Sequence, residues 1–283
     1  MAEMQGKVVV ITGATSGIGL VAAEKLARSG ARLVFIARDR SRGEATLARL
    51  REAGPGAAHA VHYADLSTIA EMKRVAAEIA ASEPRVDVLI NNAGALFSSR
   101  QVTSDGLEKT FALNHMSYFV VTLGLAQRLQ ATPGARVVNT SSHAHRRGRL
   151  DLDDLQSEKN YRGFPVYGVS KLCNILFTRE LARRWDGTGV TANSLHPGFV
   201  STRFGDQSGG WFQRLIGAAK LFAISPEKGA ETIVYLAASK EVEGVSGKYF
   251  YQCREVSPTR AGQDDDAARR LWAESARLAG IDA

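Results

Sequence analysis

Residues 12–19, Thr12-Gly13-Ala14-Thr15-Ser16-Gly17-Ile18-Gly19, decide the fold. They follow the β-branched apolar run 7–11, typical of a buried parallel strand, and precede residues 20–28, which have helical spacing. Glycines let the backbone approach a pyrophosphate, and the N–H groups and positive dipole end of a helix start stabilise its charge. The stretch therefore predicts a dinucleotide-binding site. Its glycine spacing differs from the commoner G-x-G-x-x-G, and the alternative is a turn with a purely structural role. The predicted contacts are Gly13, Thr15, Ser16, Gly17, Ile18 and Gly19.

A second apolar run, residues 32–37, ends in Arg38. An acidic residue at this strand end would accept the ribose hydroxyls of NAD, whereas an arginine complements the 2′-phosphate of NADP. A charge-assisted contact of this kind contributes roughly 1.5–3 kcal/mol, enough for about tenfold discrimination or more. The sequence therefore favours NADP(H) as the cofactor. The alternative is that Arg38 is a solvated residue among its charged neighbours.

Two further strand ends carry small or polar residues. Residues 86–90 form a clear buried-strand run, and Asn91, Ala93 and Gly94 follow it at the edge where ligands of a parallel sheet bind. The weaker strand 59–63 is followed by Asp65 and Leu66, which are candidates for the adenine ring. For Asp65, a place at the start of the helix 69–79 is equally consistent with the pattern.

Tyr167 and Lys171 stand four residues apart, so on a helix they share one face. For tyrosine to act as an acid–base near neutrality its pKa must fall by about 3, which corresponds to ~4 kcal/mol. A lysine ammonium beside the ring acts in that direction because it favours the phenolate. Ser142, after the strand 137–141, would hydrogen-bond the substrate oxygen, although Ser141 stands at the same strand end. These residues predict hydride transfer coupled to proton exchange between Tyr167 and an alcohol or carbonyl oxygen.

The ordered set of these motifs resembles the short-chain dehydrogenase/reductase family. The resemblance spans roughly residues 6–252 and rests on Thr12-Gly13-x-x-x-Gly17-x-Gly19, Asn91-Asn92-Ala93-Gly94, Asn114, Ser142, Tyr167-x-x-x-Lys171 and Pro197-Gly198. Within the family, residues 113–115, 136–142, 151–155, 170–178 and 268–272 are similar to the retinol dehydrogenase branch.

The resemblance implies further roles. Asn114 would hold a water that links Lys171 to solvent, and Tyr167 and Lys171 would also touch the cofactor. The turn after the strand 190–195 would lie at the nicotinamide end, with contacts from Pro197, Gly198, Val200 and Thr202. Helices equivalent to residues 110–129 and 169–185 pair subunits in many relatives, so a homodimer is an expectation.

Strand and helix patterns alternate from residue 7 onward, without an internal repeat or a linker. We therefore expect residues 1–283 to form a single α/β domain, a doubly wound (Rossmann) three-layer sandwich whose seven-stranded sheet is mostly parallel. The last core strand is expected at 247–251, and an amphipathic C-terminal helical extension at about 264–280. Residues 199–226 combine glycines with bulky apolar residues, which fits a lid over a lipophilic substrate; core packing or a surface patch explains them almost as well.

Composition excludes several classes of protein. The net charge of +7 is dispersed, without the aromatic-interleaved stripe typical of nucleic-acid binding. Two cysteines and six histidines show no metal-ligand spacing, so no metal is expected. No apolar run reaches the ~18–20 residues of a membrane span, and residues 1–6 do not read as a signal peptide, so a cytoplasmic protein is expected.

Two functions fit best. The first is an NADP(H)-dependent oxidoreductase that acts on a retinol-like or other medium-sized lipophilic alcohol, aldehyde or ketone. Many microsomal retinol dehydrogenases carry an amino-terminal anchor that this sequence does not show, so retinol itself is no more expected than other substrates. The alternative is a non-catalytic NADP-binding sensor or regulatory protein.

Overall fold

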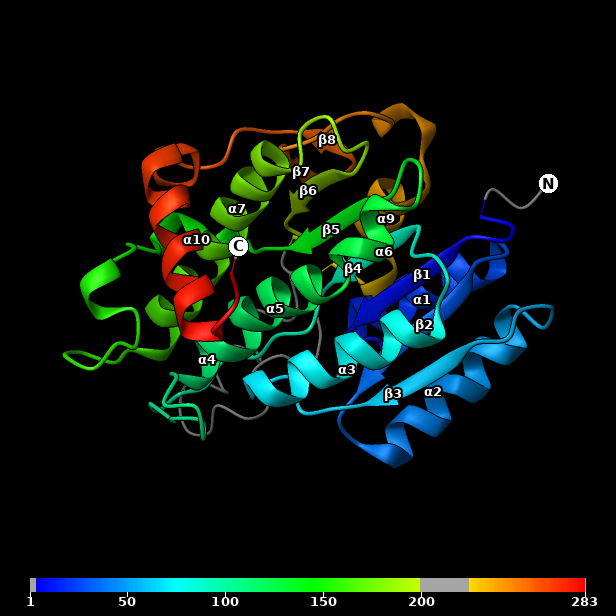
Figure 1. Ribbon diagram of the computed structural model, residues 1–283, viewed down its shortest axis with the longest axis horizontal. Coiled ribbons are helices and arrows are strands. Elements are labelled where there is room, and N and C mark those ends of the chain that lie inside the picture. The colour runs from blue at the N-terminus through cyan, green and yellow to red at the C-terminus, as the bar shows by residue number, and fades with distance from the viewer. Residues whose placement is uncertain (1–3, 199–223, 283) are drawn as a thin grey trace.

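A single mixed sheet runs through the computed structural model, which describes residues 4–198 and 224–282 (Figure 1). Over these residues the strand order is β3-β2-β1-β4-β5-β6-β7-β8. All neighbouring strands pair in parallel except β7 and β8, which pair antiparallel. The strands are β1 (Val8–Thr12), β2 (Arg32–Ala37), β3 (Ala60–Tyr63), β4 (Val88–Asn91), β5 (Arg136–Thr140), β6 (Thr191–Leu195), β7 (Tyr249–Tyr251) and β8 (Arg254–Glu255).

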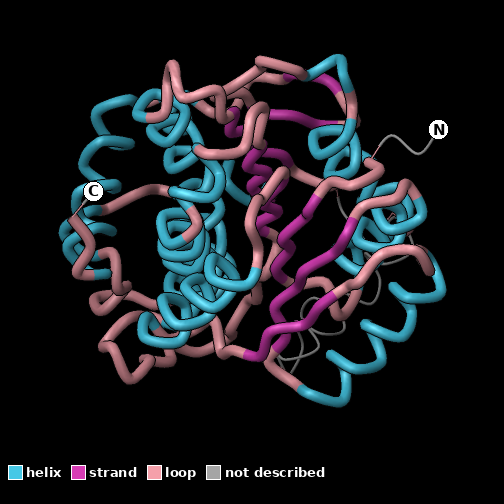
Figure 2. The backbone as a smooth tube through the Cα atoms, turned by 45° about the vertical axis from the view of Figure 1, so that its right-hand side comes forward, coloured by secondary structure: helices cyan, strands magenta, loops and turns pink. Residues whose placement is uncertain are grey.

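Helices cover both faces of this sheet (Figure 2). One apolar cluster joins the sheet to α1, α2 and α9, and a second joins the opposite face to α3, α5 and α7, with α10 packed on α5 and α7. The predicted doubly wound, three-layer α/β fold is therefore confirmed. The helices are α1 (Gly17–Arg28), α2 (Arg40–Ala53), α3 (Ile69–Ser82), α4 (Lys109–Phe111), α5 (Ser117–Gly124), α6 (Ala126–Gln130), α7 (Gly163–Arg184), α9 (Pro226–Ala238) and α10 (Asp265–Ala279).

The C-terminal helix α10 begins and ends close to the predicted bounds. The Asp264 carboxylate accepts hydrogen bonds from the backbone N–H groups of Asp266 and Ala267 and so caps the first turn. Gly280 ends the helix with φ +56°, a left-handed conformation that glycine adopts without strain. The predicted lid lies almost wholly outside the described residues. Among the described helices, none is long and apolar enough to cross a membrane.

The predicted sheet has one strand fewer than the observed one. The added strand, β8, has two residues and forms a hairpin with β7 through Gln252 and Cys253. Both turn residues have positive φ, 49° and 60°, which is the geometry of a two-residue type I′ turn. A two-residue edge strand has no periodic pattern, so the sequence did not indicate it.

This hairpin turn gives a stability prediction. Residues other than glycine and asparagine are strained at positive φ. We therefore expect the double variant Gln252→Asn, Cys253→Gly to have a free energy of unfolding about 1 kcal/mol higher. Urea unfolding of the two proteins measures the change. An unchanged or lower midpoint, with the same slope, would mean that the contact of the Cys253 thiol with the Thr232 hydroxyl outweighs the relief of strain.

The helix predicted over residues 110–129 is not continuous. It consists of α4, a π-helical turn from Ala112 to Met116, α5 and α6. The π turn contains Asn114, whose buried side chain is bonded to the backbone of Ala95. Insertions of this kind in a helix are often found at functional sites.

Candidate active site

The register of the parallel strands brings the predicted site residues to one edge of the sheet. Ile11 of β1 pairs with Phe35 of β2 on one side and with Ile90 of β4 on the other. Asn139 of β5 pairs with Asn91 of β4 and Ser194 of β6. The glycine turn and the segments that begin at residues 38, 92, 141 and 196 therefore leave the sheet side by side at its carboxyl edge, where such folds bind ligands.

The glycine turn has the shape of a backbone cradle. Gly13 and Gly17 have φ of +70° and +56°, and a Cβ on Gly19 would stand 2.2 Å from the Gly13 carbonyl oxygen. Ser16, the N-cap of α1, makes no side-chain capping bond, and the first turn of α1 has no acidic residue. Among the described residues no side chain caps the N–H groups at the start of α1, so the turn fits the pyrophosphate of a dinucleotide. Thr15 and Ile18 are half-buried on the same turn.

Thr12 and Asn92, which stand in the quoted motifs but are not among the predicted contacts, hold this cradle. The Asn92 side-chain amide donates to the carbonyl oxygens of Thr12 and Gly13, at 3.3 and 3.2 Å. In return the Thr12 hydroxyl accepts from the backbone N–H groups of Asn92 and Ala93, at 2.9 and 3.0 Å. The alternation of side chains along a strand is the signal that was available, because it points Asn91 and Asn92 to opposite faces.

Asn91 itself lies inside the sheet layer rather than at the cradle. Its amide donates to the Thr122 hydroxyl and to the Asn139 side-chain oxygen, both at 2.9 Å, and its side chain is fully buried. Of the predicted 91–94 contacts, Ala93 and Gly94 are half-buried at the edge. A Cβ on Gly94 would lie 3.1 Å from Asn114 Oδ1 and 3.2 Å from Lys171 Nζ, so glycine keeps this approach open.

Tyr167 and Lys171 lie on the same face of α7, as their spacing predicts. Lys171 Nζ lies 5.6 Å from the centre of the Tyr167 ring and 5.5 Å from that of Tyr118. The ammonium donates to the Thr140 carbonyl oxygen at 3.1 Å, and the hydroxyl of Tyr118 donates to the same oxygen at 3.3 Å. The end of β5 therefore fixes the lysine beside the tyrosine. A backbone carbonyl has no signature in the sequence, which is why Thr140 was missed.

The pKa values differ from the expected ones. Burial raises the pKa of Tyr167 well above its usual range, and a hydrogen bond with Ser142 opposes the rise. Burial also lowers the pKa of Lys171 to about 7. Burial of both groups thus acts against the fall in the Tyr167 pKa that the proposed chemistry needs, because it disfavours each charged form. The effect of the lysine on the tyrosine stays a prediction.

The two serines at the end of β5 have different surroundings. Ser141 is buried, and its hydroxyl donates to the Lys171 carbonyl oxygen at 2.7 Å. Ser142 is half-buried, caps the short 3₁₀ turn His143–Arg147 by accepting from the Ala144 N–H, and bonds with Tyr167. Ser142 is therefore the serine that faces the acid–base residue.

Asn114 is held between two segments of the site. Its Oδ1 accepts from the Ala95 N–H at 2.8 Å, and its Nδ2 donates to the Ala95 carbonyl and to the Ser170 hydroxyl. Ser170 Oγ in turn donates to the Tyr167 carbonyl oxygen at 2.8 Å. Asn114 thus ties the π turn to the helix turn that carries the tyrosine.

The remaining predicted contacts surround this centre. Arg38 follows β2, is exposed, and makes no hydrogen bond or ion pair within the described part of the chain. Asp65 accepts from the Ser67 N–H and lies three residues before Thr68, the N-cap of α3, so it does not cap that helix. Leu66 is buried beside it. Pro197 and Gly198 follow β6 and are half-buried, whereas Val200 and Thr202 lie outside the described residues.

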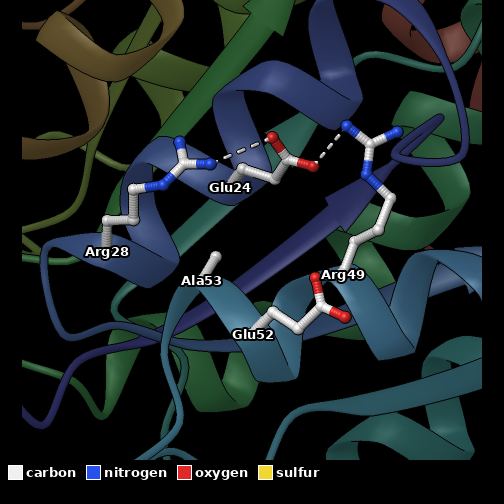
Figure 3. A pocket seen from close by; sticks show the side chains of 5 residues that line it. All are labelled: Glu24, Arg28, Arg49, Glu52 and Ala53. Atoms are coloured by element: carbon white, nitrogen blue, oxygen red, sulfur yellow. Dashed lines mark hydrogen bonds and ion pairs between the residues drawn. The ribbon is translucent and has the colours of Figure 1, made fainter.

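A separate cavity of about 270 Å³ lies between α1 and α2, away from the site (Figure 3). Arg28 and Arg49 both pair with the buried Glu24, so the charges in it are largely compensated within the protein. This arrangement is that of an ion-pair network joining two helices. Within the described ranges no group of three or more histidine, cysteine or acidic residues is placed to hold a metal ion.

Comparisons with known proteins point to one family. The model of the short chain dehydrogenase family matches residues 7–211. Retinol dehydrogenase 13 from Homo sapiens is 40% identical, over 100% of this chain and 87% of that protein. Retinol dehydrogenase 14 from Mus musculus is also 40% identical, over 98% and 87%. A crystal structure of an uncharacterized protein from Mycobacterium paratuberculosis matches with a TM-score of 0.79 and 31% identity, over 98% of this chain and 95% of that one.

Proposed function

Because the chain belongs to the short-chain dehydrogenase family, in its retinol dehydrogenase-like branch, we propose that it interconverts a lipophilic alcohol and the matching aldehyde or ketone with NADP(H). The observation that carries the proposal is the meeting of Ser142, Tyr167 and Lys171 beside the glycine cradle. Binding alone would need the cradle but not a buried acid–base pair.

The cradle and the sheet edge would hold the cofactor. In this proposal the glycine turn binds the pyrophosphate and Asp65 and Leu66 contact the adenine. The nicotinamide end is contacted by Ala93, Gly94, Pro197 and Gly198. When bound, the nicotinamide supplies or accepts the hydride. The same contacts would serve NAD or NADP, apart from Arg38.

Side chains of the protein would transfer the substrate proton and stabilise the charge that develops on the substrate oxygen. Ser142 donates a hydrogen bond to the substrate oxygen, and Tyr167 gives or takes its proton. The Lys171 ammonium lies close enough to the ring to favour the phenolate. Asn114 keeps α7 and the π turn in place.

The preference for NADP rests on Arg38. With Arg38→Asp we expect the Kd for NADPH to rise by about tenfold or more, since a charge-assisted phosphate contact is replaced by repulsion, while the Kd for NADH changes little. Fluorescence titration with both cofactors measures this. Arg51→Asp, in the last turn of α2 and so at the end of that helix away from Arg38, is the control for net charge. Equal weakening of NADPH and NADH would remove Arg38 from the phosphate site.

The class of substrate is tested by following nicotinamide absorbance while retinal, medium-chain aldehydes, a steroid ketone and a quinone are offered with NADPH. Turnover of at least one carbonyl supports the enzyme. Tight NADPH binding with no turnover of any of them favours the alternative, a sensor or regulatory protein.

Two further expectations stay proposals. A homodimer through α5 and α7 would have to accommodate α10, because Trp272 of α10 packs on Phe119 of α5 and Phe177 of α7. Another face of the protein is therefore the better candidate for self-association, and sedimentation velocity tests it. A cytoplasmic location is a prediction from the sequence that cell fractionation tests.

A further inference from the structure

The turn that carries Ser142 is packed directly on the helix that carries Tyr167. A Cβ on Gly148 would stand 2.6 Å from the Gly168 carbonyl oxygen, and a Cβ on Gly168 would stand 2.8 Å from the Ala144 carbonyl oxygen. The two backbones are thus in contact on one side of the turn. The position of the turn therefore sets how Ser142 meets Tyr167, and whatever holds its other side affects that geometry.

The His145 side chain contacts the other side of the turn that carries Ser142. The ring is buried, with 2% of its surface exposed, and its Nδ1 lies 2.7 Å from the Ser142 carbonyl oxygen. The His145 backbone N–H donates to the same oxygen at 3.1 Å. A carbonyl oxygen only accepts, so Nδ1 must carry the proton and donate it.

The other ring nitrogen of His145, Nε2, lies next to a hydrogen-bond donor. The Thr259 backbone N–H points to His145 Nε2 at 3.4 Å, so Nε2 must be bare and accept. Both contacts are satisfied by one form of the ring, the neutral Nδ1–H tautomer. Burial lowers the pKa of His145, which keeps this neutral form.

The ring also meets β7. It packs edge-on against Tyr249, with centroids 5.2 Å apart and an interplanar angle of 74°, and the Tyr249 hydroxyl lies 3.3 Å from Nδ1. The ring thus links the serine turn, the sheet edge and the segment that leads into α10. These three segments are far apart in the sequence.

We propose that His145 is a positioning residue that fixes Ser142 against Tyr167 through the bond from Nδ1–H to the Ser142 carbonyl oxygen. The proposal rests on the proposed oxidoreductase function for its kinetic test, and on the tautomer of the ring for a test that needs no turnover.

Three substitutions separate the contacts. His145→Phe keeps a ring against Tyr249 but removes both nitrogens. His145→Asn places an amide N–H near the position of Nδ1, and His145→Gln places its amide near the position of Nε2. We expect His145→Phe and His145→Gln to lower kcat by about tenfold, the worth of one hydrogen bond of ordinary strength, with the Kd for NADPH unchanged. His145→Asn should recover most of that loss.

His59 provides the matched control. It is also buried, and its ring joins the Leu33 N–H to the Gly54 carbonyl oxygen, far from Ser142. We expect His59→Phe to lower the melting temperature without changing kcat per folded molecule. If His145→Phe also lowers only the melting temperature, or if His145→Asn loses as much kcat as His145→Phe, His145 is structural and the proposal is overturned.

The tautomer is measured by ¹⁵N NMR of the histidine-labelled protein, with His145→Asn used to assign the signal. A protonated Nδ1 and a bare Nε2 support the proposal, and a proton on Nε2 overturns it. If no carbonyl compound is turned over by the unaltered protein, the proposed function fails, whereas this measurement still decides the position of the proton.

Discussion

Tyr167→Phe is expected to lower kcat by about 10²–10⁴-fold, the usual contribution of a general acid–base group. The phenylalanine ring fills the same buried volume on α7, so the fold should persist. The loss should fall on kcat more than on the Kd for NADPH, because the hydroxyl acts on the substrate proton. Stopped-flow turnover with the best carbonyl substrate, together with a fluorescence titration of NADPH, measures both.

Tyr118→Phe is the control for this experiment. Tyr118 is fully buried, shares the Thr140 carbonyl oxygen with Lys171, and also lies near the ammonium, but its hydroxyl is directed to the backbone. Removing that hydroxyl should cost stability of about 1 kcal/mol and a small part of kcat. Equal turnover losses in the two variants, or near-normal turnover in Tyr167→Phe, would show that Tyr167 does not transfer the proton.

The parts of this site that follow from local patterns could be predicted from the sequence. Three features depend only on residues that are close in the sequence: the apolar strand before Gly13, the spacing of the glycines, and the four-residue spacing of Tyr167 and Lys171. Parallel pairing then brings their strand ends to one edge, so the place of the site follows from the fold class.

The parts that depend on tertiary packing could not be predicted. The spacing of Tyr167 and Lys171 indicates that the side chains meet, but the direction of the tyrosine pKa depends on burial by other segments, and burial dominates here. The π turn at Asn114 could not be predicted for the same reason, because it also depends on tertiary contacts. A helical pattern continues through it, and the bonds that hold the side chain come from Ala95 and Ser170, far away in the sequence.

Gly19→Ala is expected to remove most of the cofactor binding. The new Cβ would stand 2.2 Å from the Gly13 carbonyl oxygen and 2.4 Å from Asn92 Nδ2, whereas ordinary contacts begin at 3.4 Å. The Gly13 oxygen belongs to the backbone, so the turn must open by about 1 Å, a displacement that can cost about 100-fold when it misplaces binding groups. We also expect the free energy of unfolding to fall by about 1–3 kcal/mol, the usual cost of overpacking. Titration with NADPH and urea unfolding measure the two effects.

Gly56→Ala is the matched control, because no atom of the described residues lies within 4 Å of a Cβ at that position and its φ is not in the left-handed region. There alanine should leave the Kd for NADPH unchanged and raise stability by about 0.4–1 kcal/mol, since it restricts the unfolded chain. The contrast isolates the close approach of Gly19 to Gly13 from any general effect of replacing glycine. If Gly19→Ala keeps the Kd of the unaltered protein while folded, the turn is a structural feature and the dinucleotide lies elsewhere, which would also remove the reason for placing the hydride donor beside Tyr167.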